Sequence, residues 1–218
     1  MKTYKIHLIR HGMTEANNDG RYIGRTDLPL SPEGLAQLLQ LKETYQYPGG
    51  VRFFTSPLTR CRQTLEVLYP GCKAESVEGL AECDFGDWEG KSIRDLKNDE
   101  RFLRWMEGSD RAIPGGEDSE AFRARVCGAF ESIVNNLIHS GDTEAVICTH
   151  GGVITMLMQI YGLPRLDPKD CLAAAGQGFT LRVTPSIWMS EPLAEALCMI
   201  PWEKEGGNCR AAAIRARR

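Results

Sequence analysis

The chain has 218 residues, 42% of them hydrophobic, and a formal net charge of −3 at pH 7. This length suits one sizeable hydrophobic core with a small insertion, and it is short for two full domains. The slightly acidic balance argues against nucleic acid or an anionic membrane as a partner, so an anionic ligand needs a locally basic pocket. Because the sequence shows neither a long apolar span nor a signal-peptide pattern, we expect a cytoplasmic protein.

Eight cysteines are spread along the sequence. They form no CxxC motif and no zinc-finger spacing, so we expect reduced thiols rather than disulfides or metal ligands. Cys127 and Cys148 lie in apolar runs, where cysteine behaves as a small hydrophobic residue.

The first predicted strand, residues 5–9, is short and apolar, and it ends at Arg10-His11-Gly12. Such a run is typical of a central strand that delivers polar residues at its carboxyl end. In α/β folds this edge of the sheet is where chemistry is expected. A polar loop follows over residues 17–30.

Two helices are predicted from their starts. Ser31 and Pro32 have the residue types of an N-cap and a first helical position, and leucines follow on one face. Residues 51–55 predict a second strand, after which Ser56-Pro57 predicts the cap of the next helix.

The rest of the sequence continues the alternation of strands and helices. The predicted elements are a weaker strand near 73–77, helices about 92–97 and 100–107, a long helix over 119–139, a strand over 144–148, a helix over 153–161, two late and antiparallel strands over 179–183 and 195–200, and a frayed basic tail over 210–218.

The strand over 144–148 ends at Thr149-His150-Gly151, so the order strand, polar-His-Gly, helix occurs twice. Parallel strands bring their carboxyl ends to the same edge of a sheet. We therefore expect His11 and His150 to meet over one pocket.

Four motifs, in chain order, resemble those of the histidine phosphatase (phosphoglycerate mutase-like) superfamily. They are Arg10-His11-Gly12-x-Thr14, Ser56-x-x-x-Arg60, Leu80-Ala81-Glu82 and Thr149-His150-Gly151-Gly152. The resemblance covers most of the chain. It implies an α/β fold, a three-layer α/β/α sandwich with a mostly parallel central sheet, and a single domain over 1–218 with a small helical insertion at about 84–116 over the active site.

The residue types suit phosphoryl transfer whatever the family. The reaction needs an in-line nucleophile, cations around the equatorial oxygens and a proton for the leaving oxygen. A neutral imidazole such as His11 attacks without first losing a proton. Arg10 and Arg60 offer planar, permanently charged groups that bind phosphate and disfavour protonation of His11. Gly12 lets the backbone come close to the phosphate.

The resemblance also implies a role for each site residue. His11 is the nucleophile, Arg10, Arg60 and His150 bind and stabilise the transferring group, Thr14 and Asn17 add hydrogen bonds, and Glu82 is the proton donor. Glu89 lies in the same segment and is the alternative proton donor. At Met13 the sequence departs from the family, where an acidic residue often stands; the nucleophile is unaffected. Because the arginines and histidines supply positive charge, we expect no metal and no other cofactor.

The segments Leu80-x-Glu82-x-x-x-Gly86-x-Trp88-Glu89-Gly90 and Pro114-Gly115-Gly116-Glu117 are similar to the branch with alpha-ribazole phosphatases and broad-specificity phosphatases. The implied function is hydrolysis of a small phosphomonoester through a phosphohistidine on His11, with alpha-ribazole phosphate or a sugar phosphate as substrate. A cofactor-dependent phosphoglycerate mutase is one alternative, and a non-catalytic phosphate-binding relative is another. A mutase must shield its phosphohistidine from water, so the short insertion favours hydrolysis.

Overall fold

The computed structural model describes residues 2–204, and the expected basic tail at 210–218 lies outside this range. Nine strands are present within it. They are β1 (Tyr4–Arg10), β2 (Tyr45–Gln46), β3 (Arg52–Thr55), β4 (Ala74–Ser76), β5 (Glu144–Thr149), β6 (Gly162–Leu163), β7 (Gly178–Val183), β8 (Ala194–Ile200) and β9 (Trp202–Glu203).

The helices of the same range agree with most of the predicted ones. The α-helices are α1 (Glu15–Asn18), α2 (Pro32–Thr44), α3 (Thr59–Leu68), α4 (Ile93–Leu96), α5 (Glu100–Met106), α6 (Ser119–Ser140), α7 (Gly151–Tyr161) and α8 (Pro185–Trp188), and the 3-10 turns are η1 (Glu78–Leu80), η2 (Gly86–Trp88) and η3 (Pro168–Cys171). None of the helices within residues 2–204 is long and apolar enough to cross a membrane.

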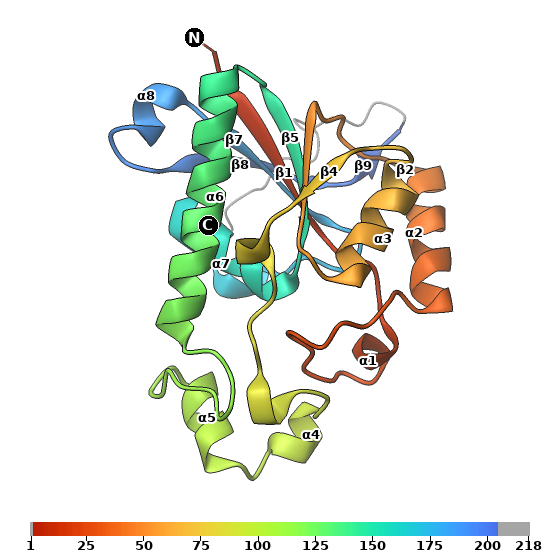
Figure 1. The fold of residues 1–218 in the computed structure, drawn as a ribbon, viewed down its shortest axis with the longest axis vertical. Coiled ribbons are helices and arrows are strands. Elements are labelled where there is room, and N and C mark those ends of the chain that lie inside the picture. Colours follow the sequence, from red (N-terminus) through yellow and green to blue (C-terminus); the bar gives the residue numbers. More distant parts are fainter. Residues whose placement is uncertain (1, 205–218) are drawn as a thin grey trace.

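Seven strands form the central sheet in the order β4-β3-β5-β1-β7-β8-β6. The β4–β3, β3–β5, β5–β1 and β8–β6 pairs are parallel, whereas β7 is antiparallel to both β1 and β8. Helices cover both faces of this sheet, with α6 and α7 on one side and α2 and α3 on the other (Figure 1). The expected α/β/α sandwich with a mostly parallel sheet is confirmed.

Alternate residues of the central strands face opposite helical layers. In β1, Ile6 and Leu8 pack in the core under α6 and α7, whereas Ile9 packs in the core under α2 and α3. In β5, Ile147 belongs to the first core and Val146 to the second. A strand buried on both faces has a continuous apolar sequence, and this explains why the strands of the sheet centre were predictable.

One helix start differs from the prediction. Ser31 caps α2 as expected, since its side chain accepts a hydrogen bond from the Gly34 N–H. The helix predicted to begin at Ser56-Pro57 instead begins at Thr59. The reason is that Asp27 Oδ1 accepts from the Thr59 N–H at 2.7 Å, so a side chain distant in sequence satisfies the first turn of α3.

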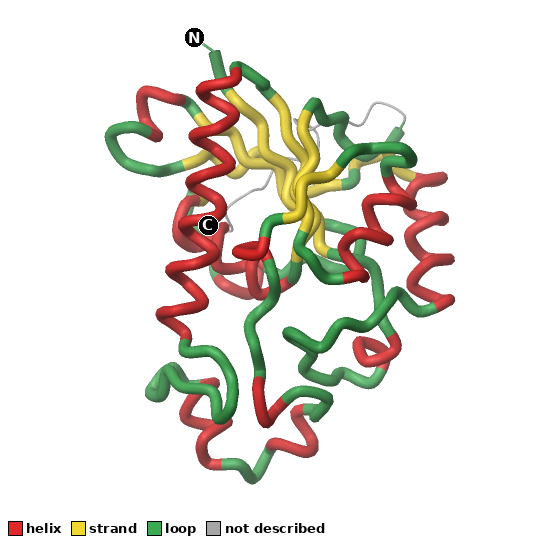
Figure 2. The backbone as a smooth tube through the Cα atoms, in the orientation of Figure 1, coloured by secondary structure: helices red, strands yellow, loops and turns green. Residues whose placement is uncertain are grey.

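Residues 84–116 form the segment with η2, α4 and α5. It lies beyond the carboxyl ends of β1 and β5, at the bottom of Figure 1, and it is mostly loop with short helices (Figure 2). Its aromatic side chains Trp88 and Phe102 are buried and pack edge to face at 5.3 Å. Tyr22, from the loop after α1, joins the same aromatic cluster, so the segment is tied to that loop.

Seven of the cysteines lie within residues 2–204, and all but one of these seven follow the expectation. Six of them are free thiols: Cys61, Cys72, Cys83, Cys127, Cys148 and Cys171. Cys198, in contrast, is disulfide-bonded, so the expectation of reduced thiols is wrong at that position.

Candidate active site

The two His-Gly motifs lie next to each other because their strands do. β1 and β5 are parallel neighbours, and Arg10 is in register with Thr149. The residues that follow, His11 and His150, therefore leave the sheet side by side, and their ring centroids are 5.1 Å apart. The His11 N–H donates to Thr149 O at 2.9 Å, which fixes the backbone at this point.

The hydrogen bond of the His11 ring defines its tautomer. Nδ1 lies 2.6 Å from Gly12 O, and because a carbonyl can only accept, Nδ1 carries the proton. Nε2 is then left with its lone pair. Burial, followed by the positive charges of Arg60 and Arg10, lowers the pKa of His11 to about 3. The ring is therefore neutral at physiological pH and nucleophilic at Nε2.

Arg60 is buried and held by the loop after α1. Its two terminal nitrogens donate to Thr26 O at 2.9 Å and to Gly24 O at 2.8 Å, and its Nε lies 3.3 Å from His150 Nδ1. These bonds fix the plane of the guanidinium, while each terminal nitrogen keeps one further N–H. Arg60 is thus an oriented cation beside His11.

His150 is also buried, and both of its ring nitrogens have partners. Since Nδ1 accepts from Arg60, Nε2 carries the proton, and it donates to Ser56 Oγ at 2.7 Å. Cys61 Sγ lies 3.6 Å from the same Nε2. Burial, followed by the charges of His11 and Arg60, lowers the pKa of His150 well below its usual value. In this structure the neutral His150 ring therefore orients the Arg60 guanidinium.

Arg10 ends β1, and its side chain lies against Gly151 in the first turn of α7. Its Nη1 donates to Ala173 O at 2.8 Å. Its Nε is buried and has no hydrogen-bond partner among residues 2–204. A buried guanidinium N–H without a partner is costly, so its presence points to a group that the site is built to receive.

Glu82 is buried at the entrance to helix α7. Its carboxylate accepts from the Cys83 N–H at 3.0 Å and from the Gly152 N–H at 2.9 Å. Burial raises the pKa of Glu82, although these two N–H groups and the positive charges of Arg60 and Arg10 act in the opposite direction. The carboxyl group can therefore hold a proton at a higher pH than an exposed glutamate.

Glu89, the alternative proton donor, has a different task in the structure. Its carboxylate accepts from the backbone N–H groups of Gly24, Arg25 and Phe85 at 2.8–3.2 Å, and from Thr26 Oγ1 at 2.7 Å. It thereby holds the loop whose carbonyls bind Arg60. With its oxygens committed to this loop, Glu89 is a positioning group, and the geometry favours Glu82 as the acid.

The two remaining predicted residues, Thr14 and Asn17, are hydrogen-bonded to each other. Asn17 Oδ1 accepts from the Thr14 N–H and from Thr14 Oγ1, each at 3.0 Å, at the start of α1. Their direct contribution to substrate binding stays a prediction. Met13 makes a backbone contact here, because its carbonyl accepts from the Ser31 N–H.

Several groups that orient the site could not be found from the motifs. Arg125 of α6 donates to the carbonyls of Ala81 and Glu82 at 2.7 and 2.8 Å and pairs with Glu117 at 2.6 Å. It fixes the segment that carries the proposed acid. An arginine in a long amphipathic helix gives no signal of this role. Ser56 and Gly152 stand in the motifs, but their bonds to His150 and Glu82 required the structure.

The site is rich in nitrogen cations rather than in metal ligands. Within residues 2–204 no group of three or more His, Cys, Asp or Glu side chains is placed to hold a metal ion. The charged groups at the carboxyl ends of β1 and β5 are the buried Arg60 and Glu82 and the half-buried Arg10, beside two neutral imidazoles. This set can bind an anion, attack it and supply a proton.

Comparison with known proteins agrees with the motifs and the fold. The chain is 32% identical over 160 residues to the adenosylcobalamin/alpha-ribazole phosphatase of Salmonella typhimurium, covering 71% of this chain and 77% of that protein. It is 30% identical over 178 residues to the probable phosphoglycerate mutase GpmB of Salmonella paratyphi C, covering 77% and 81%. The crystal structure of the alpha-ribazole phosphatase from Shigella flexneri superposes with a TM-score of 0.68 at 25% identity, covering 87% and 93%. The family model of the histidine phosphatase superfamily (branch 1) matches residues 6–174, and the chain belongs to this superfamily.

Proposed function

We propose that the protein is a phosphoric monoester hydrolase that transfers the phosphoryl group of a small phosphate ester to His11 and then to water. The observation that carries this proposal is the fixed tautomer of His11. The bond from Nδ1 to Gly12 O leaves Nε2 unprotonated in a ring that burial and two arginines keep neutral.

The phosphate is bound by the cations around that ring. The unpartnered Nε of Arg10 donates to one phosphate oxygen, and the free N–H groups of Arg60 donate to others. The first turn of α7 follows His150 and lies against Arg10, and it adds the positive end of its helix dipole. Binding of the dianion repays the cost of leaving a buried guanidinium N–H without a partner.

The reaction proceeds in two displacements. His11 Nε2 attacks phosphorus and forms the N–P bond while the ester P–O bond breaks, and Glu82 gives its proton to the leaving oxygen. A water molecule then attacks the phosphohistidine, Glu82 takes one proton from it, and inorganic phosphate leaves. Two donors, the Cys83 and Gly152 N–H groups, hold the Glu82 carboxylate in place after its proton has gone.

For the substrate we propose alpha-ribazole phosphate or a sugar phosphate, and the relatives named for alpha-ribazole phosphate hydrolysis support this choice. Similarity to a probable phosphoglycerate mutase supports an isomerase as the second candidate. We further propose that residues 1–218 are one domain in which residues 84–116 cover the site, and that no cofactor and no nucleic acid takes part.

The test is rapid quench of the protein with a ³²P-labelled phosphomonoester. We expect an acid-labile, base-stable phosphate that maps to His11, and release of inorganic phosphate in steady state. His11→Ala should form no phosphoprotein and lose several orders of magnitude in turnover. Label on Ser, Cys or Asp would refute the mechanism, and turnover that requires a bisphosphoglycerate primer would favour the mutase.

A further inference from the structure

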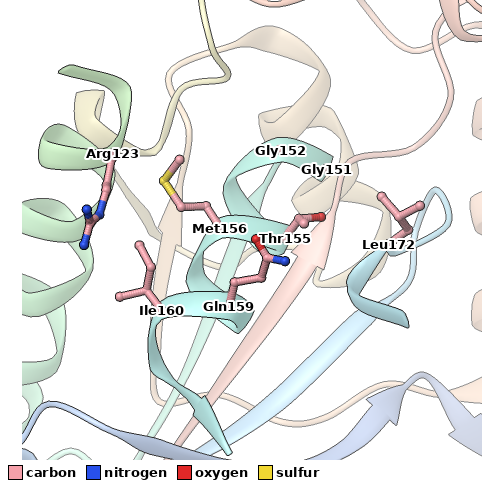
Figure 3. A pocket seen from close by; sticks show the side chains of 8 residues that line it. All are labelled: Arg123, Gly151, Gly152, Thr155, Met156, Gln159, Ile160 and Leu172. Carbon is pink, nitrogen blue, oxygen red and sulfur yellow. The ribbon is translucent and has the colours of Figure 1, made fainter. Parts of the chain in front are cut away.

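A pocket of about 490 Å³ lies along the outer face of α7, directly beside the site. Figure 3 shows its floor of α7 residues, with Arg123 of α6 at one side and Leu172 of the segment after η3 at the other. Its lining residues are Arg123, Gly151, Gly152, Thr155, Met156, Gln159, Ile160 and Leu172. It begins at Gly151 and Gly152, the two residues that follow His150.

The two glycines connect this pocket to the leaving group. A Cβ on Gly152 would lie 2.5 Å from Glu82 Oε1, so glycine is required there to admit the proposed acid. A Cβ on Gly151 would make ordinary contacts, with Arg10 Cζ at 3.5 Å. Packing therefore does not demand glycine at 151, and its missing side chain leaves the pocket open where Gly151 adjoins Arg10. The oxygen that Glu82 protonates belongs to the leaving alcohol, so the alcohol lies on this side.

The lining defines the chemistry of that alcohol. Met156, Ile160 and Leu172 present apolar surface, and the Leu172 side chain is 64% exposed. Such a surface gains free energy when an apolar body covers it. Arg123 stands at the far side and is weakly held, since its 3.8 Å pair with Glu120 joins two side chains that are each more than half exposed.

We propose that this pocket, which we name the α7 subsite, binds the alcohol portion of the substrate and selects phosphomonoesters with a bulky apolar body and a terminal anionic or acceptor group that Arg123 binds. The inference rests on the proposed phosphatase function. It makes Leu172 and Arg123 specificity-determining residues, and it disfavours three-carbon phosphates, which have no apolar body to cover this surface.

The experiment compares three esters: 4-nitrophenyl phosphate, 2-naphthyl phosphate and 6-carboxy-2-naphthyl phosphate. Leu172→Ala should lower kcat/KM about tenfold for both naphthyl esters and less than twofold for the nitrophenyl ester, because it removes an apolar contact to the larger body. Arg123→Gln should lower kcat/KM about fivefold for the carboxylated ester alone, in line with an exposed ion pair. In both variants kcat should stay unchanged, since the contact is the same in the ground state and the transition state.

Matched controls lie elsewhere on the surface. Met189→Ala removes the apolar side chain of a residue that is 74% exposed just after α8, and Arg182→Gln removes an arginine that pairs with Glu195. Both should leave the preference among the three esters unchanged. Equal losses on all three esters in the Leu172 and Arg123 variants would overturn the α7 subsite while the phosphatase function stands. Failure of the unaltered protein to hydrolyse any of the three would overturn both.

Discussion

The backbone N–H of Gly152 donates to Glu82 Oε2 at 2.9 Å, and the absence of a side chain on Gly152 is what allows this approach. The motif after β5 ends in two successive glycines, and the second of them, Gly152, has this structural cause. Helix α7 both follows His150 and holds the proposed proton donor. The ring that orients Arg60 and the proposed acid are therefore both positioned by the start of one helix.

Gly152→Ala should impair catalysis without destabilising the fold. Its Cβ would lie 2.5 Å from Glu82 Oε1 and displace the carboxyl group, so kcat for an alkyl phosphate should fall about 10²-fold. Gly128→Ala on α6 is the control, since a Cβ there meets nothing within 4 Å, and it should stabilise the protein by about 0.5–1 kcal/mol at full activity. Unchanged turnover in Gly152→Ala would show that the position of Glu82 is unimportant. Steady-state kinetics and urea unfolding of both variants decide the matter.

Glu82→Gln and Glu89→Gln should fail in different ways. Glu82→Gln removes the acid, so alkyl phosphates should lose about 10²–10⁴-fold in kcat while 4-nitrophenyl phosphate, whose leaving group needs little proton assistance, loses much less. Glu89→Gln weakens the hydrogen bonds that hold Gly24 and Thr26, so it should affect all esters equally through Arg60. The measurement is a plot of rate against leaving-group pKa for each variant. A steep dependence in Glu89→Gln and not in Glu82→Gln would reverse the assignment.

The fold was predictable from sequence where burial on both sides makes the pattern strong. The central strands are continuous apolar runs. Two helices have clear terminal residues: Ser31 caps the start of α2, and Gly141 caps the end of α6. The short strands β2, β6 and β9 have two residues each. Two residues are too few to show the alternation of apolar and polar side chains that predicts a strand. The start of α3 was misplaced because its capping partner, Asp27, is 32 residues away.

The residues of the candidate site also fall into two groups, one that the sequence predicts and one that it does not. His11, His150, Arg10, Arg60 and Glu82 stand in motifs, and the topology alone brings the first two together. The groups that orient them come from distant segments, and their contacts depend on packing that no local pattern encodes. Arg125 is the clearest example, because the carbonyls it holds at Ala81 and Glu82 lie more than forty residues earlier.

The pH profile should be controlled by Glu82 rather than by His11. Burial lowers the pKa of His11 to about 3, so the nucleophile stays neutral at and well below physiological pH. Glu82 acts as an acid only when protonated, and because burial raises its pKa, activity on alkyl phosphates should fall as the pH rises through that raised value. The basic limb of kcat/KM should disappear in Glu82→Gln. A basic limb that persists in this variant would assign it to another group.

A chelator should leave turnover unchanged, whereas an oxyanion should inhibit it. Arg10 and Arg60 supply the positive charge at the proposed phosphate position, so EDTA should leave the rate of 4-nitrophenyl phosphate hydrolysis unchanged. Vanadate, which adopts the trigonal bipyramidal geometry of the transferring group, should inhibit competitively. Loss of activity in EDTA that a divalent ion restores would contradict the proposal.

His7 should make the protein less stable in acid. It is buried in β1, where Nδ1 lies 2.9 Å from Thr180 Oγ1 and Nε2 lies 3.3 Å from Glu144 Oε1. Burial lowers the pKa of His7 to about 4, although the Glu144 carboxylate acts in the opposite direction. Between pH 6.5 and about 4 the unfolded chain therefore binds a proton that the folded chain does not, and the free energy of unfolding falls as the pH falls.

At pH 5 this single group should cost about 2 kcal/mol relative to pH 7.5. His7→Gln keeps a hydrogen-bonding side chain that does not titrate, so the difference in unfolding free energy between pH 7.5 and pH 5 should be smaller in this variant by about that amount. His139→Gln is the matched control, because it makes the same substitution at a side chain that lies exposed at the end of α6. Urea unfolding of the three proteins at both pH values gives the comparison. An identical pH dependence in His7→Gln and the unaltered chain would mean that His7 becomes protonated in the folded protein as readily as in the unfolded one.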